Sequence, residues 1–76
     1  MDRYDLYDER LLPGDTIAYL RKGELHIGKI SSIRLSGSLR VFEWEPEKKQ
    51  FSSIVKRVYT YKIIKLTPEM GVQTNK

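Results

Sequence analysis

Turn-forming residues divide the chain between Pro13 and Leu66 into segments of about 8–12 residues, and no other feature constrains the fold as strongly. The turns are Pro13-Gly14-Asp15, Arg21-Lys22-Gly23 and Ser36-Gly37-Ser38, and Pro46 ends a further segment. The intervening segments are rich in β-branched and aromatic residues, and their apolar residues do not recur at helical spacing. This pattern predicts short strands joined by turns rather than helices.

We expect five strands, which are residues 16–21, 24–35, 38–45, 51–59 and 60–66. A chain of 76 residues forms one small domain, and at this length a partly open five-stranded barrel is favoured over a sandwich. The expected fold is therefore all-β. Gly28, inside the second strand, predicts a bulge, a bend or the close approach of another backbone, and it leaves the register beyond it open.

Alternation along the strands predicts which residues form the core. The expected members are Ile17, Tyr19 or Leu20, Leu25, Ile27, Ile30, Ile33, Val41 or Phe42, Ile54, Val58, Ile63 and Leu66. In the third strand, Glu43, Glu45 and Glu47 share one side because residues two apart face the same way. We assign that side to solvent, which places Phe42 and Trp44 on the core side.

The net charge of +4 is unevenly distributed. Residues 1–12 carry four acids and two bases, residues 13–66 carry eleven bases and five acids, and residues 67–76 carry one of each. We divide the chain accordingly into an acidic leader, a basic barrel and a flexible, frayed tail. Leu6, Arg10 and Leu11 can share a helical face, but so short a helix is unstable alone in water. The leader is therefore expected either to dock on the barrel as a helix or to remain mobile.

The segment LPGDTIAYLRKGELHIGKI resembles the opening of SH3-like small barrels such as KOW and Tudor domains. The matching positions are Gly14-Asp15 before Ile17, and Gly28 before Ile30. The last strand, Tyr61 to Leu66, is also similar, and the chain resembles short SH3-like proteins of large tailed bacteriophages. The resemblance covers residues 13–66 and implies a five-stranded SH3-like barrel, in the host cytoplasm if the chain is phage-encoded.

The residue content argues against catalysis and against a bound metal or cofactor. The chain has no cysteine, His26 is its one histidine, and no nucleophile signature surrounds its serines. A dense carboxylate loop for a cation is missing, and the glycines are too widely spaced for a phosphate loop. The lack of cysteine favours the reducing cytoplasm, and no apolar run reaches the roughly 18 residues of a membrane span. We predict a binding module rather than an enzyme, without a membrane partner.

Nucleic acid is the preferred ligand because basic small barrels bind single strands by stacking bases on exposed aromatics beside a basic groove. The segment KRVYTYK, residues 56–62, interleaves the two residue types most closely. The expected contact residues are Lys29, Arg34, Arg40, Lys56, Arg57, Tyr59, Tyr61 and Lys62. The competing interpretation is that the tyrosines belong to the core and the lysines protect an edge strand.

A protein–protein interaction module is the alternative function. SH3-like barrels take extended peptides in shallow aromatic grooves. The candidates to line such a groove are Tyr4, Tyr7, Tyr19 and Trp44, and the acidic leader could cover either the groove or a basic patch.

Overall fold

The computed structural model describes residues 3–60 and 62–66, and this part of the chain is all-β, without a helix. Its seven strands are β1 (Arg3–Tyr4), β2 (Arg10–Leu11), β3 (Thr16–Arg21), β4 (Glu24–Ile33), β5 (Leu39–Glu45), β6 (Gln50–Val58) and β7 (Ile63–Leu66). β3 to β7 confirm the five strands expected from the turn signals, with small differences at their ends. The predicted all-β class is therefore correct.

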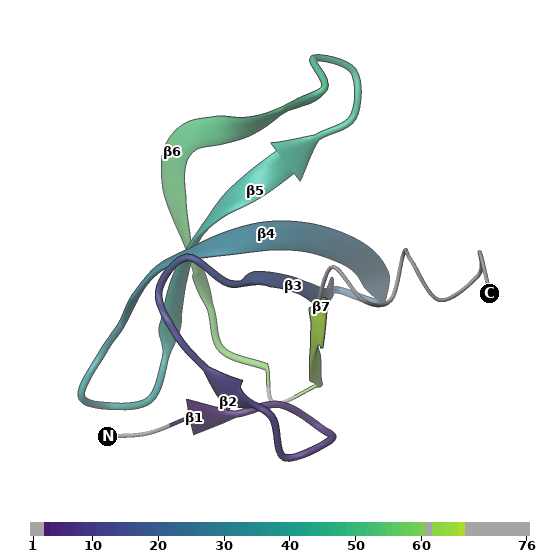
Figure 1. Cartoon of the computed structure of the whole chain (residues 1–76). Coiled ribbons are helices and arrows are strands. Elements are labelled where there is room, and N and C mark those ends of the chain that lie inside the picture. The colour runs from purple at the N-terminus through teal and green to yellow at the C-terminus, as the bar shows by residue number, and fades with distance from the viewer. Residues whose placement is uncertain (1–2, 61, 67–76) are drawn as a thin grey trace, which may run out of the picture.

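The five long strands form one antiparallel sheet in the order β6-β5-β4-β3-β7, as Figure 1 shows. β3 to β6 follow one another as a meander, and β7 returns to pair with β3. β6 and β7 lie at opposite edges of the sheet and do not pair with each other. Within the described residues the five strands therefore form an open sheet and not a closed barrel, because β7 pairs only with β3.

The leader forms a two-stranded ribbon, so the expectation of a helix there is wrong. β1 and β2 pair antiparallel. In the turn between them, Oδ1 of Asp5 accepts hydrogen bonds from the backbone N–H groups of Tyr7 and Glu9, both at 2.8 Å. Asp8 adopts the left-handed conformation, with φ at 62°. The aspartate thus satisfies amides that a helix would have bonded to its own carbonyls, which favours the turn.

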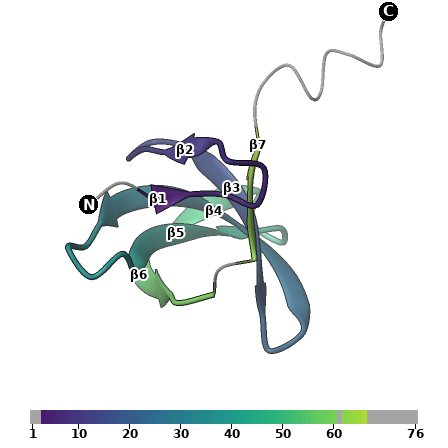
Figure 2. The ribbon, with the colours of Figure 1, turned by 90° about the horizontal axis from the view of Figure 1, so that it is seen from below.

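This ribbon is docked on the sheet at the end opposite the β5–β6 turn (Figures 1 and 2). Oδ2 of Asp5 accepts the backbone N–H of Lys65 in β7 at 2.8 Å, and the N–H of Leu6 donates to the carbonyl of Ile63 at 2.9 Å. The leader is therefore joined to β7 by one main-chain hydrogen bond as well as by the Asp5 carboxylate.

Arg3 provides a second attachment for the ribbon. Its guanidinium donates to the carbonyl oxygen of Gly37 in the β4–β5 turn and to that of Thr60 before β7, the latter at 2.8 Å. Leu11 of β2 is buried against the sheet. The leader covers one end of the core and closes it from water.

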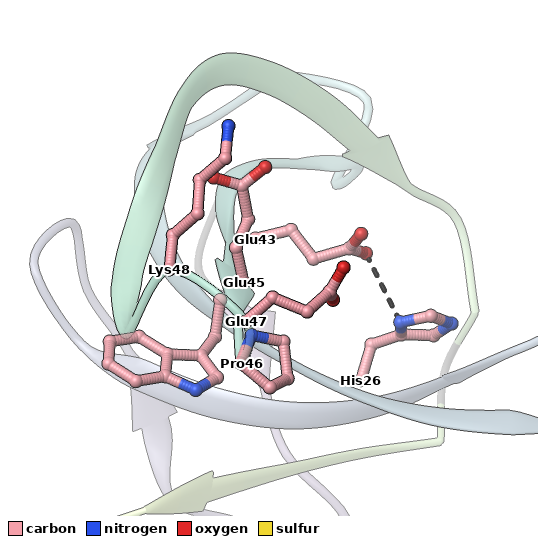
Figure 3. A pocket seen from close by; sticks show the side chains of 7 residues that line it. His26, Glu43, Glu45, Pro46, Glu47 and Lys48 are labelled. Carbon is pink, nitrogen blue, oxygen red and sulfur yellow. Dashed lines mark ion pairs between the residues drawn. The ribbon is translucent and has the colours of Figure 1, made fainter.

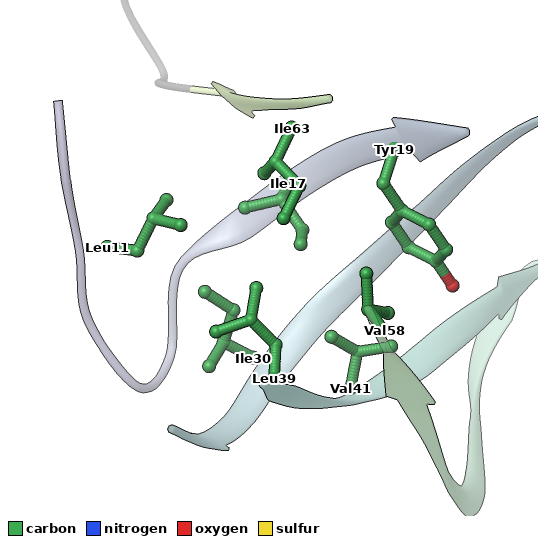
Figure 4. Close-up of a cluster of buried hydrophobic side chains, with 8 residues drawn as sticks. All are labelled: Leu11, Ile17, Tyr19, Ile30, Leu39, Val41, Val58 and Ile63. Atoms are coloured by element: carbon green, nitrogen blue, oxygen red, sulfur yellow. The ribbon is translucent and has the colours of Figure 1, made fainter. Parts of the chain in front are cut away.

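The core lies on one face of the sheet, and Leu11 of β2 joins it at one end (Figure 4). Its buried side chains are Leu11, Ile17, Tyr19, Ile30, Leu39, Val41, Val58 and Ile63. Six of the expected core residues are confirmed, and Ile33 packs against them. Leu11 and Leu39 were not expected in the core.

Three expected core residues point into solvent instead. Leu25, Ile27 and Ile54 are 69%, 37% and 69% exposed. In β4 the core side carries Gly28 and Ile30, and the register shift comes after Ile30 rather than at the glycine. The strand therefore alternates without interruption through Gly28, and its odd-numbered neighbour Ile27 faces outward.

The faces predicted for β5 are reversed. Leu39 and Val41 are buried, so Glu43 lies on the core side with them, and its side chain is only 12% exposed. Phe42 and Trp44 lie on the outer face and are half-buried. The core side accepts a carboxylate here because neighbouring strands supply donors to it.

Gly28 makes room for one of those donors. A Cβ on Gly28 would lie 3.1 Å from Cγ2 of Val41 and 3.2 Å from Cε1 of Tyr19. We expect Gly28→Ala to displace the Tyr19 ring and lower the free energy of unfolding by about 1–2 kcal/mol in urea titrations. In a Tyr19→Leu background the added methyl should cost less, and an equal cost in both backgrounds would show that the clash is with Val41 and not with the Tyr19 ring.

Candidate functional site

Four of the predicted contact residues gather on the outer face of the sheet. Arg40 lies between two buried residues of β5, so its side chain points away from the core, and it stands directly opposite Arg57 of β6. Lys29 of β4 is exposed on the same face, opposite Phe42. The hydroxyl of Tyr59, a residue that is 66% exposed, lies 3.5 Å from Nη1 of Arg57. Lys29, Arg40, Arg57 and Tyr59 are called the outer basic face below.

The other predicted contacts are elsewhere. Lys56 is opposite Val41, on the core side of β6. Arg34 and Lys62 are exposed in the segments that follow β4 and precede β7. Tyr61 lies outside the described residues. The segment KRVYTYK is therefore not one continuous contact surface, because consecutive strand residues face opposite sides.

Like charges are placed together on the outer basic face. Cβ atoms of directly opposed residues on antiparallel strands are about 4.5–5.5 Å apart, so the Arg40–Arg57 pair is electrostatically unfavourable. Within residues 3–60 and 62–66, no carboxylate forms an ion pair with Lys29, Arg40 or Arg57. The face carries positive charge that the described part of the chain does not neutralise.

A hollow lies beside the arginine pair on the same face. Its volume is about 520 Å³, and it is lined by Lys29, Ile30, Phe42, Phe51, Ser52 and Ser53. Phe42 is two residues from Arg40 on β5, so the hollow and the arginines share one side of that strand. An apolar depression next to unpaired cations suits a ligand that is partly flat and apolar and partly anionic.

The core side carries a polar cluster around Glu43 that the sequence did not predict. The hydroxyl of Tyr19 donates to Oε2 at 2.6 Å, and the two guanidinium nitrogens of Arg21 lie 3.0 and 3.2 Å from the two carboxylate oxygens. Nζ of Lys56 lies 3.3 Å from Oε1, and Nδ1 of His26 lies 3.5 Å from Oε2 (Figure 3). The carboxylate of Glu43 is thus surrounded by side chains from β3, β4 and β6.

These contacts set the ionisation of the two central groups. Burial raises the pKa of Glu43, but the hydrogen bonds from Tyr19 and Lys56 and the charge of Arg21 outweigh it, so that pKa lies below its ordinary value. Burial and the hydrogen bond to Glu43 raise the pKa of Tyr19. The carboxylate is ionised and the phenol protonated at neutral pH, which is the state in which their hydrogen bond is strongest.

The cluster borders a pocket of about 260 Å³, lined by His26, Glu43, Trp44, Glu45, Pro46, Glu47 and Lys48. Figure 3 shows the carboxylates of Glu43 and Glu47 and the ring of His26 turned toward one another. Three glutamates against one lysine disfavour an anionic ligand there. The described residues contain no group of three side chains suited to hold a metal ion.

The alternation of residues could have identified this cluster from the sequence. Tyr19 and Arg21 share a side of β3 with Ile17, and Glu43 shares a side of β5 with Val41. Glu43, Glu45 and Glu47 were instead assigned to the solvent side, because glutamates two residues apart are typical of a solvated strand face.

A comparison of the chain with protein-family models, with curated proteins and with solved structures finds no match. Within the described ranges there is no helix of the length and apolar character that a membrane crossing requires. The interpretation of the site therefore depends on its own residues.

Proposed function

We propose that this chain is a non-catalytic nucleic-acid-binding module and that the outer basic face is its contact surface. The observation that carries the proposal is the direct opposition of Arg40 and Arg57 on β5 and β6. Neither arginine forms an ion pair with a carboxylate of the described residues. An anion between two guanidinium groups removes their repulsion and accepts several charge-assisted hydrogen bonds. A backbone phosphate is such an anion.

The neighbouring residues support the same ligand. Lys29 adds a third cation on the next strand, and strands are about 4.8 Å apart, so the positive charge extends across three strands. Tyr59 offers an exposed ring beside Arg57 on which a base can stack. Arg34 and Lys62 are proposed as flanking contacts. Lys56 is not among the proposed contacts, because its ammonium group is paired with Glu43.

We further propose that the open sheet is a variant of the SH3-like small barrel, which the β3–β6 meander and the return of β7 to β3 support. The cysteine-free composition supports a cytoplasmic location for the protein.

Fluorescence anisotropy with labelled single-stranded and duplex oligonucleotides at several salt concentrations tests the nucleic-acid proposal. Arg40→Gln combined with Arg57→Gln should weaken binding about tenfold or more at low salt and reduce the slope of log affinity against log salt by about 2. The loss of two phosphate contacts explains both effects.

The matched control is Lys22→Gln combined with Lys48→Gln. This variant removes the same charge at the β3–β4 and β5–β6 turns, which lie away from the arginine pair. Its affinity should change by no more than about twofold, as expected for distant charges screened by salt. If the wild-type chain binds neither probe at low salt, the proposal is wrong.

A protein partner is the second candidate, and one observation favours it. Leu20 and Leu25 are directly opposed on β3 and β4, and with Ile27 they form an exposed aliphatic patch. Of the aromatic residues expected to line a groove, Tyr19 is buried in the core and Trp44 packs edge-on against Phe51, whereas Tyr4 and Tyr7 are exposed. One dominant protein retained after nuclease treatment of a pull-down would favour this candidate.

A further inference from the structure

The hollow beside the arginine pair exists because β6 bends away from β5. The pairs Phe42–Val55 and Trp44–Phe51 are in register, so Ser52, Ser53 and Ile54 together oppose the single residue Glu43. Extra residues in one strand bend it and interrupt its ladder of hydrogen bonds. Figure 1 shows the bend in β6. Phe42, the last residue of β5 in register before the bend, and Phe51, on the other side of the bend, both line the hollow.

The walls of the hollow are aromatic and held in place. Phe42 and Phe51 are half-buried, and the Phe51 ring meets the indole of Trp44 edge-on, with centroids 5.1 Å apart and an interplanar angle of 71°. This contact fixes the Phe51 ring from one side. The hollow therefore presents apolar, aromatic surface to a ligand without needing to rearrange.

Its rim is polar. The Ser52 hydroxyl oxygen accepts the N–H of Ile54 at 3.0 Å, so its own proton remains available to a ligand. Ser53 is exposed, and Lys29 also lines the hollow. Hydroxyl and ammonium groups around an aromatic depression match the polar edge of a heteroaromatic ring joined to a phosphate.

We propose that this hollow binds one unpaired base of a single strand whose phosphates contact Arg40 and Arg57. The inference rests on the function proposed above and narrows it to single-stranded nucleic acid. At about 520 Å³ the hollow is within the size range of small-molecule sites and has room for a base. A base in a duplex is stacked and paired, and it must first be extruded to enter. The chain should consequently prefer single strands.

Phe42→Leu is the principal test, because leucine keeps an apolar residue at this half-buried position and removes the aromatic face. We expect its affinity for a single-stranded oligonucleotide to fall about fivefold or more, as for the loss of one base stack. Affinity for the duplex and the salt dependence of binding should remain as in the wild type. Phe42→Tyr, which keeps the ring, should retain single-strand binding.

Ser53→Leu tests the same hollow without altering its aromatic walls. Ser53 is exposed, so the variant is expected to fold, and the larger side chain should lower single-strand affinity by a similar factor. Circular dichroism of every variant confirms that the sheet is formed before binding is measured.

The outcomes separate the two proposals. Failure of the wild-type chain to bind either oligonucleotide overturns the proposed function and this inference with it. Equal affinity for duplex and single strand overturns the base site alone. The same conclusion follows if Phe42→Leu and Ser53→Leu both bind single strands as the wild type does, while the arginine variant remains defective.

Discussion

Replacing Asp5 with alanine is expected to lower the free energy of unfolding by about 3 kcal/mol, as measured by urea titration at neutral pH. Asp5 is only 7% exposed, and its carboxylate accepts three backbone N–H groups, each at 2.8 Å. Alanine leaves those donors without an acceptor, and each buried donor without a partner costs about 1–3 kcal/mol. Water that reaches the exposed parts of the turn offsets some of the loss.

Glu9→Ala is the matched control, because Glu9 is an exposed acid of the same ribbon. Its effect should stay within about 0.5 kcal/mol. Asp5→Asn should fall between the two, since an amide keeps one acceptor oxygen but turns a donor toward one of the backbone N–H groups. An Asp5→Ala variant as stable as the wild type would show that the ribbon does not depend on this carboxylate.

Acid should narrow the difference in stability between wild type and Asp5→Ala. Burial raises the pKa of Asp5, but the backbone hydrogen bonds from Lys65, Glu9 and Tyr7 outweigh it and hold the pKa below the ordinary value of 3.8. A lowered pKa in the folded state stabilises the fold above the ordinary pKa, and this contribution is lost as the pH falls through the folded value. The difference between the two free energies of unfolding should therefore become smaller as the pH falls below about 4.

The second large effect is expected from Glu43→Leu, which should lower the free energy of unfolding by about 2 kcal/mol. The change leaves the buried hydroxyl of Tyr19 without its acceptor and leaves Arg21 and Lys56 facing each other without the anion between them. Arg21 and Lys56 are partly exposed, so solvent screening keeps their share of the loss small. Thermal or urea unfolding at neutral pH measures the difference.

Glu47→Leu serves as the control, since Glu47 borders the same pocket and is exposed. It should leave stability nearly unchanged. Adding Tyr19→Phe to Glu43→Leu should cost less than Tyr19→Phe costs alone, because the hydroxyl no longer has an acceptor to lose. Strictly additive effects of the two substitutions would contradict the hydrogen bond between Tyr19 and Glu43.

The stabilisation by Glu43 also depends on pH. Because the pKa of Glu43 lies below the ordinary value of 4.5, its stabilisation is complete above about pH 5 and declines as the pH falls further.

The positions of the strands could be predicted from the sequence because turn chemistry is local. Lys22 and Gly23 form the two-residue turn between β3 and β4, and both have positive φ, 53° and 79°. The sequence indicated this turn through its glycine. The register could not be predicted in the same way. The irregularities after Ile30 and at residues 52–54 depend on partners from other strands, and each one decides which face the following residues take.

The site was predictable in its residue types but not in its arrangement. Arg40 and Arg57 are visible as cations in the sequence, yet their opposition across β5 and β6 appears only once the register is known. Lys56 is adjacent to Arg57 in sequence but lies on the opposite face of β6, where its ammonium group pairs with Glu43. The role of Glu43 was missed because its hydrogen-bond donor Tyr19 is 24 residues away.

The attachment of the leader to β7 has a consequence for synthesis on the ribosome. Asp5 and Lys65 are separated by 60 residues, so a nascent chain exposes Asp5 long before its partner strand has been translated. Until then the end of the core that Leu11 covers is open to water, and the leader has no strand to join. Contacts of such long range slow folding and make it depend on the last elements to emerge. The domain should therefore acquire its native structure in one late step, with its first residues among the last to be fixed.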